Sequence, residues 1–133
     1  MNSSMKLRLG AAVLLGLAQL AARPAAAQDG RVQHFPQQTG ADLYHNICQG
    51  CHMPDAKGAA GAGAYPALAG NKHLKAGLYP VGVVMNGRKA MPAFGPMLDD
   101  AQIAAVVNFV RSSFDNHYKD AVTPEMVKAL RPR

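Results

Sequence analysis

The sequence has no tryptophan and only two cysteines, and both shortages limit what the chain can be. Four phenylalanines and four tyrosines are its only aromatic residues, so it buries a modest core by itself. A structural zinc site needs about four ligands, and two cysteines supply too few of them. The two cysteines are three residues apart, and a disulfide at that spacing closes too short a loop to stabilise the fold much.

Acidic residues are missing from Ala56 to Leu98, a stretch that contains five bases. These bases are Lys57, Lys72, Lys75, Arg88 and Lys89. Such a stretch is either an ordinary solvated surface or a docking face that steers partners with acidic surfaces. The stretch lacks the aromatic stacking platform of single-strand binders, so we expect no nucleic-acid partner.

The pattern that is present is Cys48-Gln49-Gly50-Cys51-His52, the C-x-x-C-H arrangement of covalent c-type haem attachment. Residues three and four apart share one face of a helix. We therefore expect Cys48 and Cys51 to bond the two haem vinyl groups while His52 turns its imidazole to the iron. A thiol redox pair is the alternative, but it expects a strand–helix–strand context that the sequence does not show. The expected cofactor is one covalent haem c with its iron.

No apolar run reaches the ~20 residues that span a bilayer. The N-terminus instead contains a basic start, a 14-residue uncharged run and a small-residue cleavage site: Lys6 and Arg8, Leu9–Ala22, and Ala25–Ala27. This order is typical of a secretory signal peptide, so we expect residues 1–27 to be removed and the exported protein to begin at Gln28. Arg23 interrupts the pattern and leaves an uncleaved anchor as the alternative. Haem attachment outside the cytoplasmic membrane agrees with a periplasmic location in a Gram-negative bacterium, without a membrane span after cleavage.

Capping signals and apolar spacing predict an all-α domain with no strand and no internal repeat. A helix follows Thr39 into the haem motif, and another runs from about Tyr79 to Met85 with Pro80 at its first position. The strongest helix has Asp99 as N-cap and Gln102 in a capping box, and it ends near Ser113. The predicted organisation is an N-terminal loop at 28–38, a domain at 39–115, and a tail at 116–133 with a short helix from Pro124 to about Leu130. Residues 56–63 and 88–98 are expected to be loops.

The sixth iron ligand decides whether such a site transfers electrons or binds another molecule. The candidates are Met53, Met85, Met91, Met97, Met126, His34, His45, His73 and His117. Met53 and His45 lie too close to His52 along the chain to reach the opposite haem face, and Met85 lies inside a predicted helix. Met91 and Met97 share a proline-stiffened loop before the strongest helix. The position in this loop favours Met91 and leaves Met97 open.

Together these features resemble class I cytochromes c. The resemblance extends over residues 40–111 and includes the Pro66-Ala67-Leu68 turn and the Met91-Pro92-Ala93-Phe94-Gly95 loop. It implies a small all-α fold whose first and last helices pack around one haem. It further implies that Met91 is the distal ligand, that the Pro66 carbonyl accepts a hydrogen bond from His52 Nδ1–H, and that Leu68 packs on the haem. Gly40 and Tyr44 would meet Phe109 where the two helices cross.

Residues 65–71 and 91–114 are more narrowly similar to cytochrome domains of bacterial periplasmic alcohol and aldehyde dehydrogenases. Those subunits often contain three haem domains, whereas this chain has one C-x-x-C-H motif. The resemblance implies a periplasmic one-electron carrier rather than an enzyme. Such a carrier, or haem subunit, takes electrons from a dehydrogenase catalytic subunit or respiratory complex and delivers them to an oxidase or other acceptor. The alternative is a haem-based enzyme or gas sensor with a displaceable sixth ligand.

Overall fold

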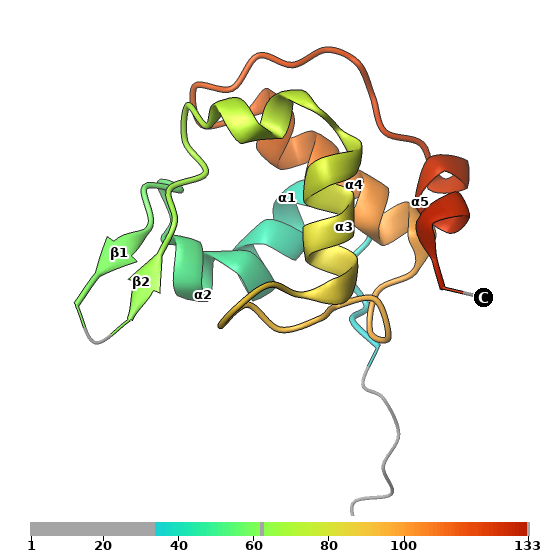
Figure 1. Cartoon of the computed structure of the whole chain (residues 1–133), viewed down its shortest axis with the longest axis horizontal. Coiled ribbons are helices and arrows are strands. Elements are labelled where there is room, and N and C mark those ends of the chain that lie inside the picture. The colour runs from blue at the N-terminus through green and yellow to red at the C-terminus, as the bar shows by residue number, and fades with distance from the viewer. Residues whose placement is uncertain (1–33, 62, 133) are drawn as a thin grey trace, which may run out of the picture. The chain divides into compact units, whose positions relative to one another are not determined.

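The computed structural model describes residues 34–61 and 63–132 (Figure 1). The expected signal peptide, residues 1–27, lies outside this part of the chain. The helices are α1 (Gly40–Leu43), the π-helix η1 (Tyr44–Cys48), α2 (Gln49–His52), the 3-10 helix η2 (Lys72–Lys75), α3 (Leu78–Asn86), α4 (Asp100–Ser112) and α5 (Pro124–Leu130). The strands are β1 (Ala59–Ala60) and β2 (Ala64–Tyr65). The fold is mostly helical, as the sequence predicts. None of the described helices has the length and apolar character needed to cross a membrane.

The elements α1, η1 and α2 follow one another without a break and lead directly into the haem motif. Their start is capped as predicted, because the Asp42 N–H donates to the Thr39 hydroxyl at 3.1 Å. The π-helical segment η1 is a wider turn that ends at the first cysteine, Cys48. The helix ends where Met53 adopts a left-handed φ of 69°.

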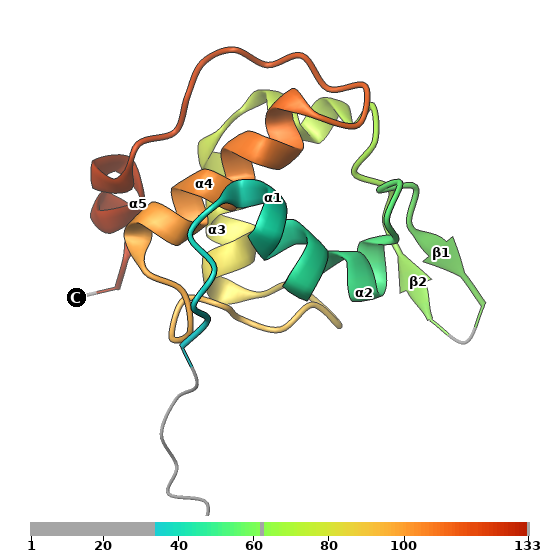
Figure 2. The ribbon, with the colours of Figure 1, turned by 180° about the vertical axis from the view of Figure 1, so that it is seen from behind.

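The helix α4 forms the centre of the core and crosses α1 at very short range. Its capping box between Asp99 and Gln102 is present, as predicted. A Cβ atom on Gly40 would lie 2.2 Å from the Ala105 carbonyl oxygen, so only glycine fits at this crossing. The rings of Tyr44 and Phe109 pack beside it with centroids 5.7 Å apart. The expected meeting of Gly40, Tyr44 and Phe109 is therefore confirmed, and Figure 2 shows α1 passing over α4.

The helix α3 begins earlier than the sequence predicts. It starts at Leu78 after Gly77, so Pro80 is its third residue rather than its first. Proline is tolerated there because the first-turn N–H groups have no partner within the helix. The helix ends one residue after the predicted Met85, because Gly87 follows Asn86 and caps the helix with a left-handed φ of 72°.

The prediction of no strands is wrong for one short ladder. β1 and β2 pair antiparallel, with Ala59 opposite Tyr65 and Ala60 opposite Ala64. The sequence gives no signal for this hairpin because its alanines and glycines show no alternation of polar and apolar residues. The ladder contains only two residue pairs and follows the haem motif directly in the chain.

Residues 116–132 pack against the domain that the sequence predicts to end at residue 115. Val122 and Val127 belong to the buried core, and the predicted helix near the end of the chain is α5. The Arg111 guanidinium is only 1% exposed and donates to the Leu74 carbonyl at 2.9 Å and to the Asp120 carboxylate at 2.8 Å. These partners compensate the burial of its charge and join α4, η2 and the C-terminal segment.

Candidate haem site

The two cysteines of the C-x-x-C-H motif lie on consecutive helical turns with different exposure. Cys48 ends η1 and is partly buried, whereas Cys51 lies in α2 and is exposed. Burial raises the pKa of the Cys48 thiol to about 12, and the neighbouring Cys51 adds to the rise.

The His52 imidazole is held in one tautomer by a neighbouring carbonyl. Its Nδ1 lies 2.9 Å from the Pro66 carbonyl oxygen, and the ring is buried with 8% exposure. A carbonyl oxygen only accepts hydrogen bonds, so Nδ1 carries the proton and Nε2 keeps the lone pair that a metal requires. This is the contact that the resemblance to cytochromes c implies between these two residues.

Backbone hydrogen bonds hold the turn that contains Pro66 and Leu68 against the motif. The Leu68 N–H donates to the Ala56 carbonyl at 2.7 Å, and the Gly58 N–H donates to the His52 carbonyl at 3.0 Å. Gly58 has a left-handed φ of 68°, and a Cβ atom there would lie 2.2 Å from the Tyr65 carbonyl oxygen. The structure thus brings Pro66 against His52, which lies 14 positions earlier in the chain, and holds Leu68 against Ala56.

Tyr44 has a polar function at this site that the sequence analysis missed. Its side chain is fully buried, and its hydroxyl donates to the Met53 carbonyl at 2.7 Å. Burial, with smaller contributions from Cys48 and Asp55, raises the pKa of Tyr44 to about 12, so the hydroxyl keeps its proton at neutral pH. The bond fixes the left-handed residue that directly follows His52. No local sequence signal predicts it, because the two residues are nine positions apart.

The loop with Met91 lies along the C-terminal end of α3. Arg88 and Met91 exchange two backbone hydrogen bonds of 3.0 Å, and the Phe94 N–H donates to the Val84 carbonyl at 2.9 Å. A Cβ atom on Gly87 would lie 2.7 Å from the Met91 carbonyl oxygen, so the tight turn requires glycine. Met85 lies inside α3, as the sequence predicts, and is a buried core residue. The coordination of iron by Met91 stays a prediction.

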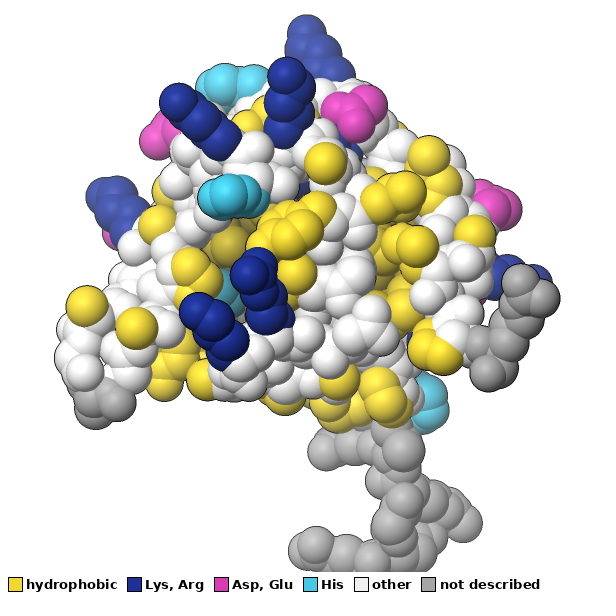
Figure 3. Space-filling view, viewed as in Figure 1, with side chains coloured by type: hydrophobic (Ala, Val, Ile, Leu, Met, Phe, Trp, Pro, Cys, Tyr) yellow, Lys and Arg dark blue, Asp and Glu magenta, His cyan; other side chains and the backbone are white. Residues whose placement is uncertain are grey.

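The donor set fits a covalently held haem c. Two thiols three residues apart precede an imidazole whose Nδ1 proton is engaged and whose Nε2 is available. Figure 3 shows apolar side chains and a histidine within a hollow on the face viewed in Figure 1, with lysine and arginine side chains at its border. An apolar macrocycle with an iron at its centre suits such a surface.

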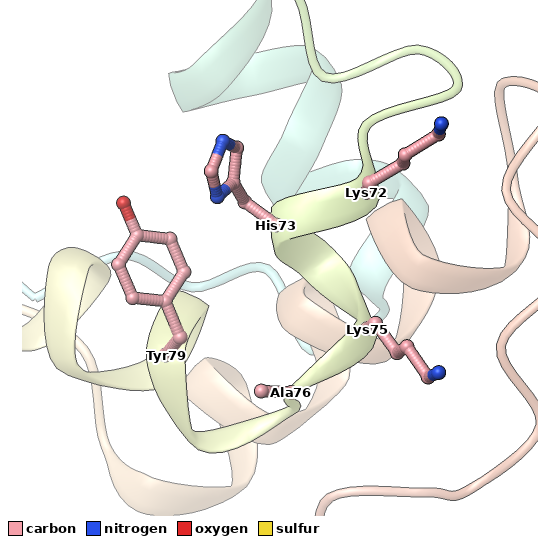
Figure 4. A pocket seen from close by; sticks show the side chains of 5 residues that line it. All are labelled: Lys72, His73, Lys75, Ala76 and Tyr79. Atoms are coloured by element: carbon pink, nitrogen blue, oxygen red, sulfur yellow. The ribbon is translucent and has the colours of Figure 1, made fainter.

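Two of the five bases in the acid-free stretch line one depression. Lys72 and Lys75 border it together with His73, Ala76 and Tyr79, and Figure 4 shows these side chains around η2 and the start of α3. The Arg88 guanidinium donates to the Tyr79 hydroxyl and lies 5.9 Å above the centroid of the ring.

Lys57 differs from this group because it pairs with Asp55 at 3.5 Å on the surface. Lys72 and Lys75 are the two of the five bases that line the depression with Tyr79.

Comparison with known proteins identifies the class. Residues 36–110 match the family described as cytochrome c oxidase, cbb3-type, subunit III, and the chain belongs to this cytochrome c family. Membership confirms the predicted covalent haem c and its iron. It also relates the chain to the cytochrome c subunits of dehydrogenases.

Two curated relatives are cytochrome subunits of dehydrogenases. The gluconate 2-dehydrogenase cytochrome c subunit of Pantoea cypripedii is 37% identical over 106 residues, covering 71% of this chain and 24% of the relative. The fructose dehydrogenase cytochrome subunit of Gluconobacter japonicus is 36% identical over 107 residues, covering 69% and 22% respectively. The matched segment therefore makes up less than a quarter of each relative's length.

A solved structure, the c-type cytochrome XoxG of Methylobacterium extorquens AM1, matches with a TM-score of 0.42 and 24% identity. The match covers 68% of this chain and 62% of that one.

Proposed function

We propose that the protein is a one-electron carrier whose haem is attached through Cys48 and Cys51 and ligated by His52 and Met91. The observation that carries the proposal is the 2.9 Å contact between His52 Nδ1 and the Pro66 carbonyl, which leaves Nε2 free for a metal. When bound, the haem supplies an iron that alternates between the ferrous and ferric states. Ligation by histidine and methionine raises the reduction potential, which suits delivery of electrons to an oxidase.

The protein side chains fix this cofactor and exclude other ligands. The Pro66 carbonyl orients the imidazole, and the Tyr44 hydroxyl fixes the backbone immediately after it. The turn that contains Leu68 is held beside the motif and would cover part of the macrocycle. With Met91 as a second protein ligand, these residues would leave no open site for a substrate or gas.

The test of the carrier is made on the exported holoprotein. We expect reversible one-electron reduction, a far-red methionine–iron absorbance band in the ferric state, and no rapid binding of carbon monoxide in the ferrous state. Both axial positions are filled in a carrier, so added carbon monoxide has to displace a protein ligand. Rapid carbon monoxide binding by the wild type would instead favour the sensor or enzyme class.

We further propose a periplasmic location and a dehydrogenase as electron donor. The location rests on the signal-peptide pattern of residues 1–27 and on the haem attachment motif. The donor rests on the relatives, which are named as cytochrome subunits of gluconate, fructose and alcohol dehydrogenases. The depression lined by Lys72, Lys75 and Tyr79 is the proposed docking face for an acidic partner surface.

The docking proposal predicts that electron transfer with an acidic partner slows as salt is added. Screening limits the reach of exposed charges to about 8–10 Å near physiological ionic strength. The double variant Lys72→Glu and Lys75→Glu should lower the second-order rate by about tenfold or more at low salt, because steering changes association rates by 10–10³. Stopped-flow mixing at several ionic strengths measures both effects.

A control with the same charge change separates the docking face from net charge. Lys119→Glu with Lys128→Glu reverses two exposed charges outside the depression and should change the rate much less. Equal losses of the electron-transfer rate in both double variants would show only an effect of net charge and would contradict the docking face.

A further inference from the structure

We propose that Arg131 is a positioning residue that holds the distal-ligand loop closed. This loop comprises residues 87–98 and contains Met91, so the inference rests on the proposed ligation by Met91. The C-terminal helix α5 would thereby act on the haem site through the loop.

The Arg131 guanidinium binds the loop and the start of α4 at the same time. Its Nη1 donates to the Gly95 carbonyl at 2.7 Å, and its Nη2 donates to the Leu98 carbonyl at 2.8 Å. Its Nε donates to the Asp100 carboxylate at 2.5 Å. The side chain is 30% exposed and that of Asp100 is 26% exposed, so solvent screens this pair only in part. All three nitrogen atoms of the planar fork are engaged, which lysine cannot reproduce.

The same loop is held from its other side by α3. The Gly95 N–H donates to the Met85 carbonyl at 3.0 Å, and the Phe94 N–H donates to the Val84 carbonyl at 2.9 Å. Gly95 is the common point, because its N–H binds α3 while its carbonyl binds Arg131. A Cβ atom on Gly95 would lie 2.7 Å from the Met85 carbonyl oxygen, so the loop approaches α3 too closely for another residue. The loop is thus clamped between α3 and Arg131.

The helix that presents Arg131 is itself fixed to the core. Val127 is fully buried, and the Thr123 hydroxyl caps the helix by accepting from the Met126 N–H. The Arg131 N–H donates to the Lys128 carbonyl at 3.2 Å, so the residue continues the last turn of α5. Figures 1 and 2 both show α5 beside the first turn of α4. The clamp therefore joins the end of the chain to a loop that precedes it by more than 30 residues.

A clamp of this kind sets how often the distal ligand leaves the iron. An added ligand such as imidazole binds only when the loop is open, so its apparent affinity is proportional to the open fraction. Removing the bonds to Gly95, Leu98 and Asp100 weakens the closed state and should raise that fraction. We expect Arg131→Gln to bind imidazole about tenfold more tightly, which corresponds to about 1.4 kcal/mol. The reduction potential should fall as methionine ligation weakens.

The experiment titrates imidazole into ferric holoprotein and follows the loss of the far-red methionine–iron band. Arg131→Lys keeps a cation but loses the fork, so its apparent affinity should lie between those of the wild type and Arg131→Gln. Asp100→Asn removes the charge pair and leaves the bonds from Arg131 to the Gly95 and Leu98 carbonyls. Its imidazole affinity should therefore rise less than that of Arg131→Gln. Lys128→Gln is the matched control, since it removes one exposed charge from the same helix and should titrate like the wild type.

Each outcome decides one point. An unchanged imidazole affinity in folded Arg131→Gln, or an equal rise in Lys128→Gln, overturns the clamp. Should Arg131→Gln fail to fold, the comparison of Arg131→Lys and Asp100→Asn with the wild type decides in the same way. A wild type that lacks the methionine–iron band overturns the ligation by Met91, and the clamp with it. A wild type that shows the band while the Arg131 variants titrate unchanged overturns the clamp alone.

Discussion

Holoprotein in which Cys48 and Cys51 are both replaced by alanine is expected to retain no haem once it is denatured. The chain contains no other cysteine, so no thioether can form elsewhere. His52 keeps its contact with Pro66 in this variant, so haem can bind only through coordination and is lost when the fold opens. A haem stain of denaturing gels, with the protein amount checked by antibody, measures the loss.

The two single variants serve as controls for this result. Cys48→Ala and Cys51→Ala each keep one attachment point and should retain reduced covalent staining. Cys51 is exposed whereas Cys48 is partly buried, so Cys48→Ala also removes packed volume beside the core. Normal staining of the double variant would contradict covalent attachment at this motif.

Met91→Ala is expected to remove the methionine ligand and open the haem iron to added ligands. The ferric methionine–iron band should disappear, the reduction potential should fall, and the ferrous form should bind carbon monoxide readily. The backbone of Met91 is held by two hydrogen bonds to Arg88, so the substitution should leave the turn itself intact. Absorbance spectroscopy, redox titration and carbon monoxide mixing measure the three effects.

Met97→Ala is the matched control because it lies in the same loop and is similarly half-buried. Its N–H donates to the Phe94 carbonyl, a bond that alanine keeps. The band, the potential and the resistance to carbon monoxide should all remain. Loss of the band in Met97→Ala together with its retention in Met91→Ala would assign the ligand to Met97 instead.

The sequence predicts those parts of the fold that depend on local chemistry. Thr39, Asp99 and Thr123 are N-caps in the structure because each side-chain oxygen accepts a bond from an N–H three residues later. The stop at Gly87 follows from a backbone conformation that glycine adopts without strain. The prediction of the haem also rests on a local feature, which is the spacing of Cys48, Cys51 and His52.

The features that the sequence does not predict depend on partners that are distant along the chain. The Tyr44 hydroxyl donates to the Met53 carbonyl, nine positions later, and Arg131 donates to the Gly95 carbonyl, 36 positions earlier. The β1–β2 hairpin pairs alanines whose pattern gives no signal. The burial of Arg111 is likewise set by carbonyl groups from η2 and from Asp120.

The wider turn of η1 between Tyr44 and Cys48 holds one residue more than an α-helical turn would. An α-helix closes each turn with about 3.6 residues, so deleting one exposed residue such as Asn46 should let the segment close as an ordinary α-helical turn. Tyr44 would still pack against Phe109, and Cys51 and His52 would still face Pro66. Homologous chains are therefore expected to differ by one residue in this segment while keeping the tyrosine and the motif in the same relative orientation.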